Sequence, residues 1–403
     1  MLSQWFDPEP GPAAIPGVLA REFVRQGHSV SVLTGFPNYP EGRIHEGYRQ
    51  RPRSRSVVDG ISVTRVPLYA SHDASAIGRA TNYGTFALSA TMFGRSALRD
   101  VDAVWVYNSP VTVALPMSVL TRRGRTPIFL QVQDLWPDSL VESGMLAGGT
   151  GTRIIAAGVR RVVRAMERDA AIVGVSSRGA RDLILERNPR LDPARVIYSP
   201  NPVDESLFVP VSQIQDLPAA PWADRFTVMY VGAVGDVQGL ETLVAAAAAL
   251  KGRSDIAFVI VGDGIARQRL EASARDLDNV TFVGRVPMAQ VPGYLARGDV
   301  QIVSLADRPF LRHSTPSKIA TLLASEVPVI GHLAGDGARL ILDAGAGEVA
   351  EPGDVEGLVH AISSMASASP RRLATYAAAG RDYYRSHMSA EAVASAVTDS
   401  LSC

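Results

Sequence analysis

Short runs of apolar and β-branched residues recur along the chain, and stretches with apolar residues every three to four positions lie between many of them. The runs predict buried strands, and the spaced stretches predict amphipathic helices. The predicted strands span residues 30–34, 62–67, 103–107, 128–132, 171–175, 196–198, 227–231, 257–261, 280–283, 300–304 and 327–331. The clearest predicted helices span residues 16–26, 240–250 and 266–277. This alternation predicts an α/β fold with parallel sheets that carry helices on both faces.

A loop-rich stretch at residues 200–223 separates the predicted strands into two groups. It contains Pro202, Pro210, Pro218 and Pro221. Domain boundaries usually fall in such segments, so we expect two Rossmann-like, doubly wound domains at residues 1–205 and 206–385 that face each other across a cleft. Residues 386–403 would form a C-terminal helix that packs back on the first domain. In folds of this kind ligands bind outside the carboxyl ends of the strands.

The composition excludes several classes of protein. The 403 residues include 40 basic and 40 acidic side chains, which argues against a partner that is a nucleic acid. The single cysteine, Cys403, excludes an internal disulfide framework and a cysteine-rich metal site. Asp7 and Glu9 precede any apolar run, so we expect no secretory signal. Residues 103–121 are free of charge, but prolines and polar residues interrupt them, and we expect a soluble, cytoplasmic protein.

The neutral total hides two halves of opposite charge. Residues 1–200 carry 24 basic and 17 acidic side chains, a net charge of +7, and residues 201–403 carry 16 and 23, a net charge of −7. The basic half favours an anionic binding partner, or peripheral contact with an anionic membrane surface at the inner face of the membrane. The acidic half can bind a phosphate only through a few local donors.

One helical stretch in the basic half is amphipathic. It contains Arg160, Arg161, Arg164 and Arg168 together with Val159, Val162, Val163 and Met166. This pattern indicates either a solvated helix face or a surface patch for anionic lipid.

Glycine turns follow two of the predicted strands in the second half. The first turn contains Gly232 and Gly235 and leads into a helix, and the second contains Gly262 and Gly264. Glycine permits tight turns and close approach of the backbone, and a helix N-terminus offers free N–H groups to a phosphate. Either turn alone is most simply structural, but two in one Rossmann-like domain favour a bound nucleotide.

The chain has only two lysines, Lys251 and Lys318. Lys318 follows Ser317 at the start of a predicted helix, where a cation opposes the helix macrodipole by up to about 1 kcal/mol. A bound phosphate would reverse the sign of that interaction, so this position favours a phosphate ligand over a solvated surface residue. Further along, residues 335–338 open another predicted helix and could form a second loop for phosphate or sugar.

Several short motifs follow one another along the chain: WFDPE at residues 5–9, TGFPNYP at 34–40, QDLWPD at 133–138, PNPVD at 200–204, QGL at 238–240, GDG at 262–264 and PSK at 316–318. Taken in this order, they resemble the motifs of glycosyltransferase family 4, the group 1 transferases of the GT-B fold, and in particular of the branch that builds bacterial surface polysaccharides. The resemblance implies transfer of a sugar, with retention of its anomeric configuration, from a nucleoside diphosphate sugar bound by the second domain to an acceptor bound by the first. It also implies that no metal and no other cofactor takes part.

The resemblance assigns roles to individual residues. Lys318 and Gln238, with the backbone of Gly235, would stabilise the leaving diphosphate, and Asp134 would orient an acceptor hydroxyl. The expected donor-binding residues are Gly235, Gly262, Gly264, Arg285, Arg312, Ser317, Thr321, Asp336, Gly337 and Ala338. The expected acceptor-binding residues are Gly11, Asn38, Tyr39, His45 and Trp136, because aromatic rings stack on sugars and polar groups bond their hydroxyls. The alternatives are a loop that only covers the core, domain packing for Trp136 and an ordinary surface position for Arg285.

Several positions depart from the family pattern. The chain has Ala233 and Gln238 in place of a basic pair, His313 and Thr321 in place of two glutamates, and Gln133 in place of a histidine. Thr321 is short and neutral, so ribose recognition must be weaker or different, and Lys318 and Arg312 are the main cations expected near the diphosphate. Two rivals therefore stay open: a sugar-nucleotide epimerase or hydrolase of the same fold, and a non-catalytic sugar-nucleotide-binding protein. The acceptor would be a glycan precursor or a small metabolite.

Overall fold

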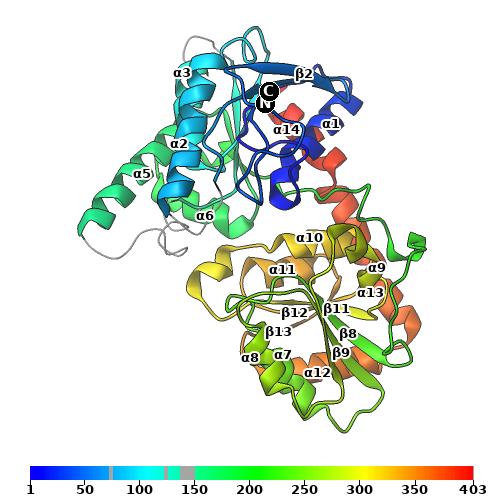
Figure 1. Cartoon of the computed structure of the whole chain (residues 1–403). Helices are drawn as coiled ribbons and strands as arrows, with labels where there is room; N and C mark the ends of the chain where they lie inside the picture. The colour runs from blue at the N-terminus through cyan, green and yellow to red at the C-terminus, as the bar shows by residue number, and fades with distance from the viewer. Residues whose placement is uncertain (72–75, 122–125, 137–149, 403) are drawn as a thin grey trace. The chain divides into compact units, whose positions relative to one another are not determined.

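The chain folds into two compact units (Figure 1). The computed structural model describes residues 1–71, 76–121, 126–136 and 150–402. One unit comprises Met1–Pro202 together with Ala390–Cys403, and the other comprises Val203–Ser389. Both units are α/β with mainly parallel sheets, which confirms the predicted class of two Rossmann-like, doubly wound units. The chain therefore leaves the first unit after Pro202 and returns to it at Ala390.

In the sheet of the first unit, residues near the N-terminus connect two groups of strands. Its described strands lie in the order β2 (Ser54–Val58), β3 (Ile61–Val66), β1 (Ser31–Gly35), and then β4 (Val104–Tyr107), β5 (Ile128–Val132), β6 (Ile172–Val175) and β7 (Val196–Tyr198). Leu2 forms a parallel bridge to Leu33 and another to Val106. Residues near the N-terminus thus occupy the position of a central strand between β1 and β4, where the strand order reverses.

Helices cover both faces of this sheet (Figure 1). The helices on one face are α2 (Ala76–Phe93), α3 (Ala114–Thr121), α5 (Thr150–Asp169) and α6 (Arg178–Arg187). Their buried side chains, such as Phe86 and Met166, share a core with Leu130. The other face carries α1 (Ile15–Arg25) and α14 (Ala390–Ser402), which pack around Trp5 and Phe129.

The second unit contains a parallel sheet with a clear switch point. Its described strands lie in the order β10 (Val280–Gly284), β9 (Ile256–Val261), β8 (Phe226–Val231), β11 (Val300–Ser304), β12 (Val329–His332) and β13 (Gly347–Ala350). The chain runs from β8 outward to β10 and then returns to place β11 on the other side of β8. Ligands of doubly wound sheets bind at such a reversal, beyond the carboxyl ends of the strands.

Two layers of helices bury this sheet. The core of one face contains side chains of α7 (Glu241–Ala249), α8 (Arg267–Ser273) and α12 (Val355–Ala366). The core of the other face contains side chains of α9 (Val291–Leu295), α10 (Ser317–Ala324), α11 (Asp336–Asp343) and α13 (Pro370–His387). Buried on both faces, parallel strands become continuous apolar runs, which is why most of them are evident in the sequence.

Two of the described strands, β2 and β13, are not predicted from the hydrophobic pattern. Four of the five side chains of β2 are exposed, and it pairs antiparallel with β3 at the edge of the sheet. β13 is short, begins with Gly347 and is also an edge strand. β2 has no buried face, and β13 has only one fully buried side chain, that of Ala350, so neither strand needs the apolar run that marks the others.

The loops after β8 and β9 cross with their backbones in contact. The N–H of Gly232 donates to the carbonyl oxygen of Val261 at 2.9 Å, and the N–H of Val234 donates to that of Asp263 at 3.0 Å. Gly262 has a φ of 138°, and a Cβ there would overlap the carbonyl oxygen of Gly232. Glycine at position 262 is therefore required by the close approach of the two loops.

We expect Gly262→Ala to lower the free energy of unfolding by at least about 2 kcal/mol, because the new Cβ collides with backbone and the residue keeps a positive φ. Gly252→Ala is the matched control, since the space at its Cβ position is open. Denaturant unfolding of both variants measures the difference. Equal stability of the two would contradict the close crossing of the loops.

Candidate functional site

A hollow of about 690 Å³ lies at the carboxyl ends of β8, β9 and β10 in the second unit. The residues around it include Gly232, Ala233, Gly262, Asp263, Gly264, Arg285 and Met288. A Cβ at Gly264 would overlap the carbonyl oxygen of Val234, so this glycine lets the two turns pack tightly beneath the hollow. The predicted glycine turns thus form one continuous backbone surface at the switch point of the sheet.

Lys318 reaches the same loop from α10. Its Nζ lies 3.5 Å from the centroid of the Tyr230 ring, and a Cβ on Gly232 would lie 2.7 Å from Nζ. Within the described ranges, Lys318 makes no ion pair and no hydrogen bond. Burial lowers the pKa of this half-buried lysine to about 7. The geometry therefore holds an amine without a counterion at a helix N-terminus, over an aromatic face that favours its protonated form.

Tyr230 contacts both Lys318 and the glycine turn after β8. It is buried at the end of β8, and its hydroxyl donates to the carbonyl oxygen of Ala233 at 2.5 Å. One side chain thus supports the turn and also forms the platform for Lys318. Sequence reasoning missed Tyr230, because an aromatic residue in an apolar run predicts only a core position.

The structure corrects the expected role of the Gly235 backbone. The N–H of Gly235 donates to Oε1 of Gln238 at 3.0 Å, so it is not open to a phosphate in this structure. The same bond orients the side chain of Gln238. In the described part of the chain its Nε2 has no acceptor, so this amide group, rather than the N–H of Gly235, can donate a hydrogen bond to a ligand at the turn.

A buried relay of hydrogen bonds holds the turn that carries Gln238. The N–H of Gly353 donates to Nε2 of His332 at 2.9 Å, which leaves the proton of the neutral ring on Nδ1. Nδ1 lies 2.8 Å from Oγ of Ser304, and that hydroxyl donates to the carbonyl oxygen of Gln238 at 2.6 Å. Burial lowers the pKa of His332 to about 4, which keeps the ring neutral near pH 7. Since His332 and Ser304 end different strands, no local motif in the sequence connects them.

The two arginines expected near a diphosphate differ in their surroundings. Arg285 is exposed at the edge of the hollow and makes no ion pair with any described residue. Arg312 is also exposed, but its Nη2 lies 3.0 Å from Oδ1 of Asp307. Among the described residues, Arg285 is thus a cation without an ion-pair partner at the edge of the hollow, whereas Arg312 already has an anionic partner.

The remaining predicted donor residues belong to the starts of α10 and α11. Thr321 donates a weak hydrogen bond of 3.4 Å to the carbonyl oxygen of Ser317, within its own helix. Asp336 and Gly337 are the first residues of α11, and Ala338 packs against the core of the second unit. Gly335, with a φ of 75°, lets this turn contact the backbone of Arg312.

In the first unit, Asp134 follows β5 beside the end of β4. The hydroxyl of Ser109 donates to Oδ2 of Asp134 at 3.1 Å, and burial raises the pKa of this carboxyl group. Asn108, also at the end of β4, is completely buried, and neither polar atom of its side chain has a hydrogen-bond partner among the described residues. Sequence reasoning missed Asn108 and Ser109, because they lie in a charge-free stretch without a motif.

The structure also corrects the expected role of Asn38. This side chain is 1% exposed, its Nδ2 donates to the carbonyl oxygen of Phe36 at 3.1 Å, and its Oδ1 accepts from Asn82 at 3.1 Å. The buried carboxylate of Glu9 accepts the N–H groups of Asn38 at 2.8 Å and Tyr39 at 3.0 Å. Asn38 therefore fixes the loop after β1 and is not presented to a ligand.

The other predicted acceptor residues surround this loop. The ring of Tyr39 lies edge-on to Trp5 at 5.6 Å between centroids, and Nε2 of His45 lies 3.0 Å from the carbonyl oxygen of Tyr39. Gly11 is exposed, with a φ of 64° and open space at its Cβ position. Trp136 is 9% exposed, and its Nε1 has no hydrogen-bond partner in the part of the chain that the structure describes.

Gln133, which replaces a family histidine, forms an amide pair. Its Nε2 donates to Oδ1 of Asn201 at 2.8 Å, and Nδ2 of Asn201 donates back to its Oε1 at 2.6 Å. Elsewhere, no group of three or more His, Cys, Asp or Glu side chains within the described ranges is placed to hold a metal ion. No described helix is both long enough and apolar enough to cross a membrane.

Comparisons with known proteins match both halves of the chain. Residues 11–202 match the model of the glycosyl transferase 4-like domain, and residues 225–368 match that of the glycosyl transferases group 1. The putative colanic acid biosynthesis glycosyl transferase WcaI of Escherichia coli is 28% identical over 324 residues, which cover 76% of each chain. A GDP-mannose-dependent phosphatidylinositol monomannoside mannosyltransferase of Mycolicibacterium smegmatis is 26% identical over 304 residues, which cover 69% of this chain and 78% of the relative.

A solved structure shows the same fold. HepE of Anabaena, in complex with UDP and glucose, superposes with a TM-score of 0.64 at 14% identity, over 100% of this chain and 98% of HepE. The fold and the matches to both halves agree with the order of motifs along the sequence. The chain belongs to glycosyltransferase family 4, the group 1 transferases of the GT-B fold that use nucleotide sugars, and it is similar to those of bacterial surface polysaccharide synthesis.

Proposed function

We propose that the protein transfers a sugar from a nucleoside diphosphate sugar to a glycan precursor or a small metabolite, with retention of configuration and without a metal ion. The amine of Lys318, which has no counterion among the described residues and lies against a glycine turn, carries this proposal. The first unit, with its basic excess, would hold the acceptor and make peripheral contact with an anionic membrane at its inner face. The relatives support the donor class, since one uses GDP-mannose and HepE was solved with UDP.

The proposed chemistry depends on stabilising the leaving diphosphate. Negative charge grows on the β-phosphate as the bond to the sugar breaks, and preorganised donors aimed at that charge lower the barrier. Lys318, the free N–H groups at the start of α10 and Nε2 of Gln238 supply such donors. The second half has a net charge of −7, so these local groups rather than a general positive field must hold the anion.

The proposed acceptor site is the edge of the first sheet near Asp134. With its raised pKa, this carboxyl group can accept a hydrogen bond from an acceptor hydroxyl and orient it, with Ser109 fixing its position. Asn108 adds a buried amide that makes no side-chain hydrogen bond with any described residue. Among the relatives, the mannosyltransferase of Mycolicibacterium smegmatis is named for a lipid acceptor, phosphatidylinositol monomannoside, and WcaI is named for colanic acid biosynthesis, which supports a glycan precursor as the acceptor.

We expect Lys318→Ala to lower kcat/KM by about 100- to 1000-fold, because the leaving diphosphate loses its main cation. The assay uses a panel of UDP-, GDP- and dTDP-sugars, preceded by thermal shift to find the nucleotide that binds. Lys251→Ala is the matched control: it removes the other lysine, whose exposed Nζ bonds only the carbonyl oxygen of Asp276 at 2.6 Å. Near-normal turnover of Lys318→Ala would refute the assignment, and stabilisation by no nucleotide would refute catalysis by this site.

Binding of the nucleoside diphosphate should take up a proton above pH 7. The free amine of Lys318 has a pKa of about 7, and a bound diphosphate favours its charged form, so affinity should fall by up to about tenfold for each pH unit above 7. Isothermal titration calorimetry in buffers of different ionisation enthalpy measures the uptake. In Lys318→Ala the dependence should vanish. A wild-type affinity that stays constant through this range would contradict a protonated Lys318 in the complex.

Two further measurements test the finer parts of the proposal. NMR of the product should show the anomeric configuration of the donor, and an inverted product would refute retention. Activity should persist after treatment with EDTA and should not rise when Mg²⁺ or Mn²⁺ is restored. Rapid release of free sugar in the absence of any acceptor would favour a hydrolase instead.

A further inference from the structure

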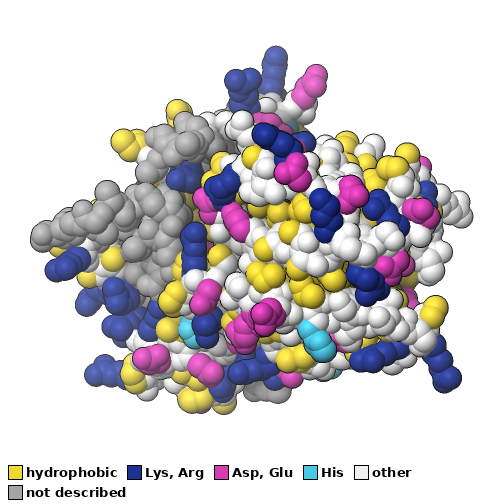
Figure 2. Space-filling model, turned by 90° about the horizontal axis from the view of Figure 1, so that it is seen from below, with side chains coloured by type: hydrophobic (Ala, Val, Ile, Leu, Met, Phe, Trp, Pro, Cys, Tyr) yellow, Lys and Arg dark blue, Asp and Glu magenta, His cyan; other side chains and the backbone are white. Residues whose placement is uncertain are grey.

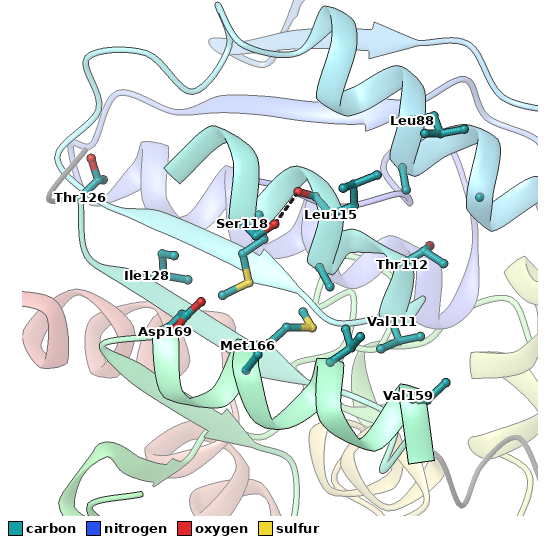
Figure 3. A pocket seen from close by; sticks show the side chains of 17 residues that line it. Leu88, Val111, Thr112, Leu115, Ser118, Thr126, Ile128, Val159, Met166 and Asp169 are labelled. Atoms are coloured by element: carbon teal, nitrogen blue, oxygen red, sulfur yellow. Dashed lines mark hydrogen bonds between the residues drawn. The ribbon is translucent and has the colours of Figure 1, made fainter. Parts of the chain in front are cut away.

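An apolar groove of about 1120 Å³ lies between α2, α3 and α5 of the first unit, and none of the predicted site residues is among its described lining (Figure 3). Figure 3 shows Leu88 from α2, Leu115 from α3 and Val159 from α5 around it, with Met166 and Ile128 deeper inside. Asp169 is the one carboxylate among the described residues of the lining. The proposed transfer reaction uses none of these side chains.

The groove exposes large apolar side chains to water. Leu88 of α2, Leu115 of α3 and Val162 of α5 line it and are 56%, 39% and 43% exposed. The same helices expose further apolar side chains outside the lining, namely Ile77, Met92, Val119, Ile154 and Ile155. Single exposed apolar residues are ordinary, but a group on three packed helices around an open groove marks an interaction surface.

The neighbouring face of α5 is strongly basic. A second hollow, of about 530 Å³, is lined there by Arg160, Arg161, Arg164, Arg168 and Arg190. Among the residues that the structure describes, none of these five arginines forms an ion pair with a carboxylate. In the view of Figure 2, several Lys and Arg side chains lie close together at the left, the side on which α5 lies in Figure 1.

The nearest buried carboxyl group does little to neutralise this charge. Oε2 of Glu167 accepts from Nδ2 of Asn188 at 3.2 Å, on the inner side of α5. Burial raises the pKa of Glu167 to about 7, so a large part of the population is neutral near that pH. The five arginines that line the second hollow therefore keep most of their positive charge.

We propose that this face of the first unit docks on a bilayer of anionic phospholipid, with the α5 arginines on the lipid phosphates and the apolar rim among the acyl chains, one of which enters the groove. Charge complementarity selects this occupant. The arginines of α5 form no ion pair with a described carboxylate and lie beside exposed apolar side chains of the same helix, which matches the headgroup and acyl layers of such a membrane. The inference specifies the peripheral contact proposed above. It does not depend on the transfer reaction.

The first experiment is co-sedimentation of the full chain with vesicles of phosphatidylcholine alone or of phosphatidylcholine with phosphatidylglycerol. The protein should bind only the anionic vesicles, and added salt should weaken the binding. The double variant Arg160→Gln and Arg164→Gln should bind roughly 30-fold more weakly, since each arginine near an anionic surface contributes about fivefold. The matched control, Arg371→Gln with Arg385→Gln, removes the same charge from α13 of the second unit and should bind like the wild type.

The second experiment tests the groove. A tryptophan at its rim, Leu115→Trp, should shift its fluorescence to the blue on anionic vesicles and be quenched by lipids brominated on their acyl chains. Leu342→Trp, at an exposed position of α11 in the second unit, is the control and should show neither effect. Ile155→Ser with Val162→Ser changes only exposed side chains and should weaken vesicle binding without lowering thermal stability.

Each outcome bears on the proposal. Wild type that binds neither kind of vesicle, or both equally, would overturn it. Binding that persists in the Arg160→Gln and Arg164→Gln variant would remove α5 from the contact, and unquenched Leu115→Trp on bound protein would refute insertion at the groove. Transfer to a soluble acceptor is measured on the same variants: activity that survives while vesicle binding is lost separates the docking surface from the catalytic assignment, and loss of both would contradict their independence.

Discussion

The candidate site of the second unit depends on the position of one amine, that of Lys318. Lys318 places its ammonium over Tyr230 and against Gly232, and no carboxylate among the described residues neutralises it. The arrangement requires glycine where the lysine contacts the turn, an aromatic residue at the end of β8 and a helix that begins at Ser317. An isolated amine of this kind is costly in the empty protein, and an anion that restores its charge removes the cost. The site is therefore least stable when empty and is suited to a ligand that carries phosphate.

The parallel strands of both units could be predicted because burial on both faces turns each into an apolar run. The glycine turns and Lys318 could be predicted for a similar reason, since their chemistry is local to a strand end or a helix start. The relay from His332 through Ser304 to Gln238 could not, because it joins the ends of separate strands that only the folded sheet brings together. The surroundings of Asn38 could not be predicted either: its residue type suits a sugar, but its N–H donates to Glu9 and its Oδ1 accepts from Asn82, and both partners are distant in sequence.

The departures from the family pattern have local explanations in the structure. Gln133 satisfies both its donor and its acceptor through Asn201, so the loss of a histidine leaves no unpaired group at that point. Gln238 stands where a basic residue is common, and it orders its own turn through Gly235. The site thus has fewer cationic side chains than the family pattern predicts. At two of the changed positions, the neutral amides of Gln133 and Gln238 fix the local backbone or a neighbouring side chain through hydrogen bonds.

The return of the chain to its first unit has a consequence for how the protein is made. Val393, Ala394 and Val397 of α14 complete a core that also contains Trp5 and Phe129, so residues near both ends of the chain are needed to close it. In the second unit, the hydroxyl of Tyr384 accepts a hydrogen bond from the N–H of Val203 at 3.2 Å. The residues that complete this unit therefore all precede α14 in the sequence. During synthesis from the N-terminus, the later unit can finish folding while the earlier one still exposes the apolar surface that α14 will cover.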